Sequence, residues 1–167
     1  MFRSSQRRPT QSHESGDFEL ISGSSDALYN QGNALQNQGM QDKAIPYYQK
    51  AIRLRPDNVE AIYKLANAFE TQARLEEAIA CYEKTIELVP DSAAAHFNLG
   101  NALLRRGRLS EAIESYRRAV RLSPNMAEAY CNMATAFKEL GDLNEAIKAY
   151  RKAVSLKPNY ADAFNNL

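Results

Sequence analysis

The chain has 167 residues, of which 44% are hydrophobic and 25% charged, and this length suits one ordinary domain. The 21 lysines and arginines against 20 acidic residues give a net charge of +1, which argues against a protein whose main target is nucleic acid. No apolar run approaches the roughly 18 residues of a membrane span. Cys81 and Cys131 form no CxxC pair, so a reducing compartment such as the cytoplasm is the simpler expectation.

Residues 1–24 form a polar leader that is rich in serine and glutamine. Such a composition predicts disorder. The leader also contains three arginines that precede any acid, Arg3, Arg7 and Arg8. An organellar transit peptide is therefore the alternative, although the stretch lacks the apolar face of an amphipathic helix. We expect a cytoplasmic protein.

From residue 25 onward the sequence repeats with a period of 34 residues. The period is marked by four prolines, Pro56, Pro90, Pro124 and Pro158. A tyrosine column has the same spacing, Tyr48, Tyr82, Tyr116 and Tyr150, as does a column of small residues, Gly32, Ala66, Gly100 and Ala134. The solenoid region 25–167 then divides into units 25–58, 59–92, 93–126 and 127–160 and a partial unit 161–167. A fixed period of this size is typical of a solenoid.

Each unit is predicted to form two helices. In unit three the first helix carries His96, Leu99, Gly100 and Leu103 at i, i+3, i+4 and i+7, which predicts one buried stripe and makes His96 a core residue. The second helix ends before the proline, which cannot continue it. Pro46 lies inside the second helix of unit one and predicts a late start or a slight kink there, with the helix retained.

The helix ends also have sequence signals. Residues directly after the prolines are expected to cap the next first helix, namely Asp57, Asp91, Asn125 and Asn159. Three glycines are expected to end the first helices in the left-handed conformation, Gly39, Gly107 and Gly141. Ala73 takes this place in unit two, so that turn is expected to be less well specified.

These motifs resemble the tetratricopeptide repeat, which has the same 34-residue period. Unit three carries the family's pattern as His96-x2-Leu99-Gly100-x2-Leu103, then Ala112-x3-Tyr116, then Pro124. The family's frequent tryptophan is absent, and its column holds Leu28, Ile62, His96, Tyr130 and Phe164. The resemblance implies a right-handed, all-α solenoid of antiparallel helix pairs. Solenoids commonly bind partners on an extended concave face.

Asparagine recurs opposite the buried stripe of the first helices. The sixth residue of the units is Asn30, Lys64, Asn98, Asn132 and Asn166, and the ninth is Asn33, Asn67, Asn101 and Thr135. Asparagine costs several tenths of a kcal/mol relative to alanine in an exposed helix, so this recurrence is hard to credit to stability. A side-chain amide can pair with the backbone of an extended peptide. The alternative is that duplicated units share asparagine by descent.

We therefore expect a partner-binding groove on the first helices. Its candidate residues are Asn30, Asn33, Tyr63, Lys64, Asn67, Phe97, Asn98, Asn101, Asn132 and Asn166. Cys131 is expected to face this groove beside Asn132. The asparagine column is similar to the repeats preceding O-linked N-acetylglucosamine transferases, where it contacts the substrate backbone. A substrate-recognition segment of such an enzyme, with the catalytic domain outside this chain, is the alternative function.

A carboxylate clamp for acidic C-terminal tails is not expected. That subgroup of the family needs lysines and an arginine in the groove, and the corresponding places hold Tyr63, Glu128 and Asn132.

No catalytic, cofactor-binding or metal-binding constellation is visible in the sequence. His13 and His96 are the only histidines, and no Cys/Asp/Glu cluster accompanies them. The prediction is a protein–protein interaction scaffold or adapter, without catalysis, that captures an extended peptide or a partner helix. We expect no nucleic acid and no membrane among its partners.

The charges and the chain end add two expectations. Unit 59–92 has three basic and seven acidic residues, whereas unit 93–126 has six arginines and two acids. Arg105 and Arg106 are a candidate basic patch for an acidic partner, and compensation between the two units is the alternative. The chain stops within a first helix, where Phe164 and Leu167 lack a partner helix. A fragment, or self-association through this uncapped end, is expected.

Overall fold

The structure is a computed structural model, and it describes residues 24–158. Within this range it contains eight α-helices and no strand. The leader up to residue 23 lies outside the described residues. So do the expected cap at Asn159, the partial unit 161–167 and Asn166.

The helices alternate between a first and a second helix in each unit. The first helices have 13 residues each and are α2 (Ser25–Asn37), α4 (Val59–Thr71), α6 (Ala93–Arg105) and α8 (Ala127–Glu139). The second helices have 14 residues each and are α3 (Gln41–Leu54), α5 (Leu75–Leu88), α7 (Leu109–Leu122) and α9 (Leu143–Leu156). Equivalent helices begin 34 residues apart throughout.

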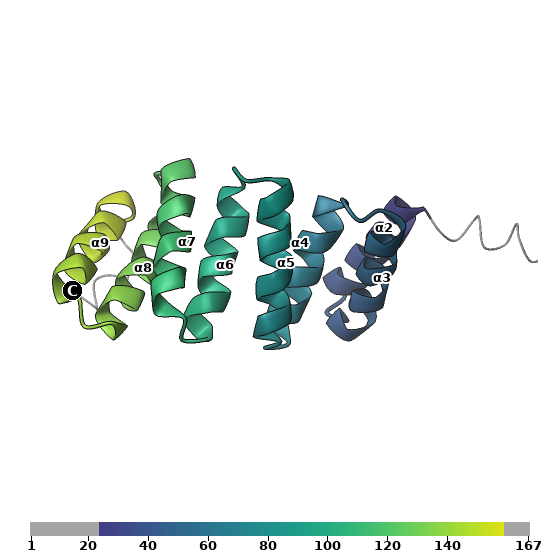
Figure 1. The fold of residues 1–167 in the computed structure, drawn as a ribbon, viewed down its shortest axis with the longest axis horizontal. Coiled ribbons are helices and arrows are strands. Elements are labelled where there is room, and N and C mark those ends of the chain that lie inside the picture. Colours follow the sequence, from purple (N-terminus) through teal and green to yellow (C-terminus); the bar gives the residue numbers. More distant parts are fainter. Residues whose placement is uncertain (1–23, 159–167) are drawn as a thin grey trace, which may run out of the picture.

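The helices pack only against near neighbours in the chain. Each first helix packs on the second helix of its own unit, and each second helix packs on the first helix of the next unit. Successive first helices also touch, α2 with α4 and α6 with α8. Figure 1 shows the result, an elongated row of helices side by side. The predicted all-α solenoid of antiparallel helix pairs is confirmed.

The tyrosine column forms the centre of each unit. Tyr48, Tyr82 and Tyr116 are 0% exposed and Tyr150 is 1% exposed. The small column allows this close packing, because a Cβ added at Gly100 would lie 2.6 Å from Cε1 of Tyr116. The predicted role of both columns in packing is confirmed.

The turns between the two helices of a unit are uniform. The three glycines expected there have φ between 75° and 84°, so their predicted left-handed conformation is confirmed. Ala73 adopts the same region, with φ 58°, although this conformation costs an ordinary residue about 1–2 kcal/mol. Unit two therefore keeps the same turn, and the strained backbone at Ala73 lowers the stability of the fold by that amount.

The predicted helix caps are wrong by one residue. The first helices begin one position later than expected, so Asp57, Asp91 and Asn125 lie outside the cap position. Asn58 caps α4, where its Oδ1 accepts from the Ala61 amide at 3.0 Å. Ser92 caps α6 in the same way, and Met126 precedes α8 with no side-chain cap. The reason is a backbone turn: the amide of the cap residue donates to the carbonyl three residues earlier, Asn58 to Arg55 for example, at 3.0 Å.

Three further expectations need correction. α3 begins at Gln41, the position equivalent to the start of every other second helix, so Pro46 causes no late start. His96 is half-buried, not a core residue, and its Nε2 lies 2.9 Å from the Pro90 carbonyl oxygen. Cys131 is only 4% exposed and does not face a groove, because α8 turns it into the core.

Candidate partner-binding face

The predicted site residues lie along one side of α2, α4, α6 and α8, which we call the first-helix face. Asn30 is exposed, and the other described members of the set are half-buried. These are Asn33, Tyr63, Lys64, Asn67, Phe97, Asn98, Asn101 and Asn132. The half-buried side chains still reach the surface.

The asparagines at the ninth position have a structural role that sequence reasoning missed. Each accepts a hydrogen bond from the column tyrosine of its own unit: Tyr48 to Asn33 at 2.9 Å, Tyr82 to Asn67 at 2.6 Å and Tyr116 to Asn101 at 2.8 Å. In unit four Thr135 replaces asparagine, and its Oγ1 lies 3.0 Å from the Tyr150 hydroxyl oxygen. A buried hydroxyl without an acceptor costs about 1–3 kcal/mol. At the ninth position, asparagine therefore does contribute to stability, and the expectation that its recurrence is hard to credit to stability is wrong there.

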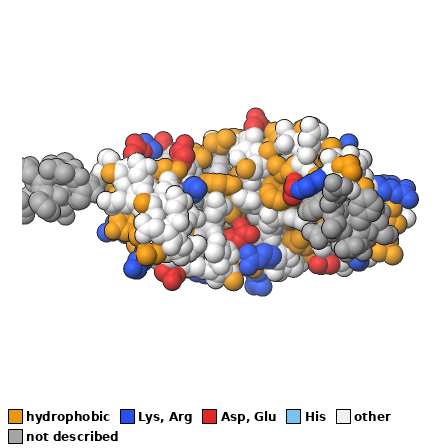
Figure 2. Space-filling view, turned by 180° about the vertical axis from the view of Figure 1, so that it is seen from behind, with side chains coloured by type: hydrophobic (Ala, Val, Ile, Leu, Met, Phe, Trp, Pro, Cys, Tyr) orange, Lys and Arg blue, Asp and Glu red, His pale blue; other side chains and the backbone are white. Residues whose placement is uncertain are grey.

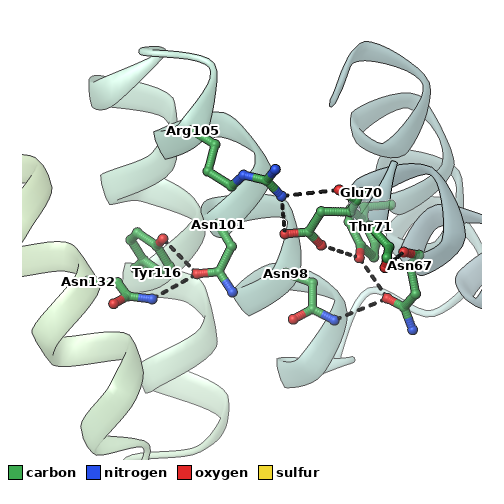
Figure 3. Close-up of polar contacts among 9 residues, drawn as sticks. Asn67, Glu70, Thr71, Asn98, Asn101, Arg105, Tyr116 and Asn132 are labelled. Atoms are coloured by element: carbon green, nitrogen blue, oxygen red, sulfur yellow. Dashed lines mark hydrogen bonds and ion pairs between the residues drawn. The ribbon is translucent and has the colours of Figure 1, made fainter. Parts of the chain in front are cut away.

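The asparagines at the sixth position connect one unit to the previous one. Nδ2 of Asn132 donates to Oδ1 of Asn101 at 2.9 Å, and Nδ2 of Asn98 donates to the Tyr63 hydroxyl at 2.7 Å. Asn98 also lies 3.5 Å from Oδ1 of Asn67, a long contact. Figure 3 shows these amides in a row that crosses from α4 to α8. The row links successive first helices through side chains alone.

Part of each amide remains available. Among residues 24–158, the Nδ2 group of Asn101 donates no hydrogen bond, and the Oδ1 atoms of Asn98 and Asn132 accept none. A primary amide has two N–H donors and one carbonyl acceptor. From Asn98 through Asn101 to Asn132, the row therefore offers an unused acceptor, an unused donor and an unused acceptor in turn.

Aromatic side chains at the fifth position border the amide row. The rings of Tyr29, Tyr63 and Phe97 each lie about 6 Å, centroid to centroid, from the column tyrosine of the same unit. Burial raises the pKa of Tyr63, while its hydrogen bonds with Asn67 and Asn98 act in the opposite direction. The rings are half-buried, so they belong partly to the core and leave an apolar edge on the face.

Glu70 is a charged member of the face that sequence reasoning missed. Its Oε2 accepts from the Tyr82 hydroxyl at 2.8 Å, and its Oε1 lies 3.4 Å from a terminal nitrogen of Arg105 (Figure 3). Burial, together with this carboxylate, raises the pKa of Tyr82. The available signal was its spacing, because Glu70 follows Asn67 by three residues and so shares the same helix face.

The candidate basic patch at the end of α6 is paired with acids of the previous unit. Arg105 contacts Glu70, and Arg106 forms an ion pair with Glu76. These contacts favour the alternative of charge compensation between the two units. Figure 2 shows small groups of acidic and basic side chains between larger uncharged areas on one face.

The described residues offer no other recognisable chemistry. Within 24–158 no group of three or more His, Cys, Asp or Glu side chains is placed to hold a metal ion. In the same range, no helix combines the length and the hydropathy needed to cross a bilayer. Burial raises the pKa of the Cys81 thiol to about 11, which makes it a poor nucleophile.

Comparisons with known proteins give a consistent result. Family models described as tetratricopeptide repeat match residues 25–58, 63–127 and 127–160. A crystal structure of MamA is 30% identical over 81% of this chain and 79% of that chain, with a TM-score of 0.79. Another, of the MamA protein, is 29% identical over 85% and 78%, with a TM-score of 0.83. MamA residues 41-end from Desulfovibrio magneticus RS-1 is 24% identical over 82% and 77%, with a TM-score of 0.77, and shares the fold. A search of curated proteins found no match.

Proposed function

Because this chain belongs to the tetratricopeptide repeat family, we propose that it is a protein–protein interaction scaffold that captures a partner segment along the first-helix face. The segment is an extended peptide, with a partner helix as the alternative, and the chain carries out no catalysis of its own. One observation carries the proposal, the alternation of unused donors and acceptors along the amide row. The backbone of an extended peptide alternates N–H and C=O groups in the same way.

The amide row is also preorganised for binding. The ninth-position amides are held by buried tyrosines, and the sixth-position amides are held by the preceding unit. Side chains that are already ordered lose little conformational entropy when a partner binds. Pairing with backbone groups makes no demand on the partner's sequence, so this mode suits a scaffold with several partners.

The test replaces the sixth-position asparagines Asn98, Asn132 and Asn166 together with alanine. Each lost amide contact is worth about 0.5–1.5 kcal/mol, so affinity for a partner recovered by pulldown is expected to fall at least about tenfold. The matched control is Asn144→Ala, which removes an exposed asparagine from α9 and is expected to leave affinity unchanged. Unchanged affinity in a folded triple variant, as judged by circular dichroism, contradicts the proposal.

A second candidate is favoured by the same asparagine column. The chain would be the substrate-recognition segment of an O-linked N-acetylglucosamine transferase-like enzyme, and its amide row would hold the substrate backbone. The gene sequence beyond the codon for Leu167 separates the two candidates. A nucleotide-sugar-binding domain there supports the transferase, and a stop codon supports the adapter.

The proposals on location and on self-association concern the two ends of the chain, residues 1–24 and 161–167. We propose a cytoplasmic protein, and a reporter fused with and without residues 1–24 tests this against organellar targeting. Self-association through residues 161–167 predicts a concentration-dependent mass in light scattering. A monomer at all concentrations contradicts it.

A further inference from the structure

Two pockets border the first-helix face near the N-terminal ends of its helices. The polar pocket, of about 410 Å³, lies between α2 and α4 and includes Asp26, Asn30, Arg55 and Glu60. The apolar pocket, of about 230 Å³, lies one unit further along and includes Glu60, Tyr63, Val89 and Ala94. Asn30 and Tyr63 belong to the first-helix face, so both pockets border that face.

Glu60 is shared by the two pockets. Within residues 24–158 it forms no ion pair, and Lys64, one turn further along α4, forms none either. The other charges of the polar pocket are already matched, since Arg55 and Asp26 pair at 2.8 Å. Of the charged side chains that line the polar pocket, Glu60 is therefore the one that forms no ion pair with a described residue.

The apolar pocket has a different character. Its walls include Val59, Val89 and Ala94, and Val89 is 40% exposed. The ring of Tyr63 forms another wall, and its hydroxyl accepts the hydrogen bond from Asn98. A side chain in this pocket would lie next to the amide row, where the partner backbone is proposed to run.

We propose that the captured segment carries a lysine or arginine that enters the polar pocket and pairs with Glu60, and an aliphatic residue that fills the apolar pocket. This inference rests on the proposed function and adds side-chain specificity to it. A lysine or arginine is proposed for the polar pocket because its positive charge complements the carboxylate of Glu60. An aliphatic residue is proposed for the apolar pocket because it would cover the exposed side chain of Val89. Packed helices lie about 8–10 Å apart, and an extended chain in the polyproline II conformation rises about 3.1 Å per residue with three residues per turn. Two side chains three residues apart therefore lie on the same side of the peptide, about 9 Å from each other.

The test titrates the full, isotopically labelled chain with short glycine–serine peptides and follows amide chemical shifts by NMR. One peptide carries Lys-x-x-Leu, a second replaces the lysine with glutamate, and a third replaces the leucine with serine. Because Glu60 is exposed, the lysine peptide is expected to bind about two- to fivefold more tightly than the glutamate peptide. Shifts are expected at Glu60, Tyr63 and Val89.

Two variants assign the preferences to their pockets. Glu60→Gln keeps the shape of the side chain and is expected to abolish the preference for lysine over glutamate. Glu83→Gln removes an exposed carboxylate from α5 and is the matched control, expected to retain that preference. Val89→Ser is expected to abolish the preference for leucine over serine and to leave the charge preference intact.

The outcomes separate this inference from the proposed function. If all three peptides bind equally, or if Glu60→Gln keeps the preference for lysine, the inference is overturned. If the peptides bind an Asn98→Ala, Asn132→Ala variant as tightly as wild type, backbone capture by the amide row is overturned instead. No binding of the Lys-x-x-Leu peptide at millimolar concentration also overturns the inference, and the partner-affinity test then decides the function separately.

Discussion

At the ninth position of units one to three, a single amide serves the core and the surface together. Its carbonyl oxygen accepts a hydrogen bond from the hydroxyl of a buried tyrosine, and in unit three its nitrogen donates to no other described residue and lies on the first-helix face. The sixth-position amides of units three and four differ, since their nitrogens are engaged and their oxygens are unused. The two columns should therefore respond differently to substitution.

Asn101→Ala is expected to destabilise the fold more than Asn132→Ala. The first change leaves the Tyr116 hydroxyl, in a ring that is 0% exposed, without its acceptor, which costs about 1–3 kcal/mol of the free energy of unfolding. The second change removes one donor from a half-buried position and should cost less than about 1 kcal/mol. Urea denaturation measures both, and equal losses would show that the tyrosine bond is not the source.

The sequence predicted the two columns but not the bond between them. A tyrosine and its asparagine are 15 residues apart and lie on different helices. A period of 34 residues aligns equivalent residues of different units, but it does not predict which residue the tyrosine hydroxyl contacts. Thr135 in unit four was a usable clue, because it preserves an oxygen at the place of the asparagines. The caps failed for a similar reason, since the turn that shifts them to Asn58 and Ser92 is a backbone feature.

At the scale of a helix, α3 differs from the other second helices by its internal proline. Pro46 is exposed in the second turn of the helix and has no N–H to donate to the carbonyl of Asp42. The equivalent residues in the other units are Ala80, Glu114 and Lys148. Packing of Ala44, Ile45 and Tyr48 against neighbouring helices keeps α3 formed despite the lost bond.

Pro46→Ala is expected to raise the free energy of unfolding by about 1–3 kcal/mol, because it restores a helix hydrogen bond and removes a ring clash. The control is Pro124→Ala, which alters an exposed proline in the turn before α8. That change should lower stability by up to about 1 kcal/mol through greater freedom of the unfolded chain. The measurement is chemical denaturation of both variants, and a loss of stability in Pro46→Ala would refute the account of α3.

Helix positions were the most predictable feature, because one period fixes all of them at once. The period gave four units, and glycines with left-handed backbone end three first helices as expected. Ala73 shows the limit of such rules, because it adopts the left-handed region that its residue type disfavours. Its turn is closed by the same backbone hydrogen bond as the glycine turns, from the Arg74 amide to the Phe69 carbonyl at 2.9 Å.

For the whole molecule, stability comes from stacked cores more than from charges. Ion pairs connect neighbouring units, for example Arg118 with Asp91 at 2.8 Å and Arg106 with Glu76 at 2.5 Å. These side chains are between 40% and 78% exposed, and such pairs contribute only up to about 1 kcal/mol each. The net charge of +1 therefore conceals acidic and basic units that compensate each other locally.

The tyrosine column predicts a loss of stability in alkali. Burial raises the pKa of Tyr48 to about 12 and raises those of Tyr82, Tyr116 and Tyr150. The ordinary value is about 10, so the folded chain holds these protons more tightly than the unfolded chain. This stabilisation is complete below pH 10 and is lost as the pH rises through the pKa values of the folded state.

Absorbance at 295 nm and circular dichroism, recorded together against pH, test this prediction. The column tyrosines are expected to ionise above pH 10 and only as helical signal is lost. Ionisation of all nine tyrosines near pH 10 with intact helical signal would mean that the column is open to solvent.

Site-specific photo-crosslinking tests whether partners bind the first-helix face. Benzoyl-phenylalanine replaces Phe97, which is half-buried on that face, or Gln49, which is exposed on α3. Each full chain is then irradiated in a lysate of the cells that make the protein. If partners bind the first-helix face, they crosslink from position 97 and not from position 49. The double substitution Asn98→Ala, Asn132→Ala is then expected to weaken the crosslink. Partners that crosslink from position 49 and not from position 97 would contradict binding at the first-helix face.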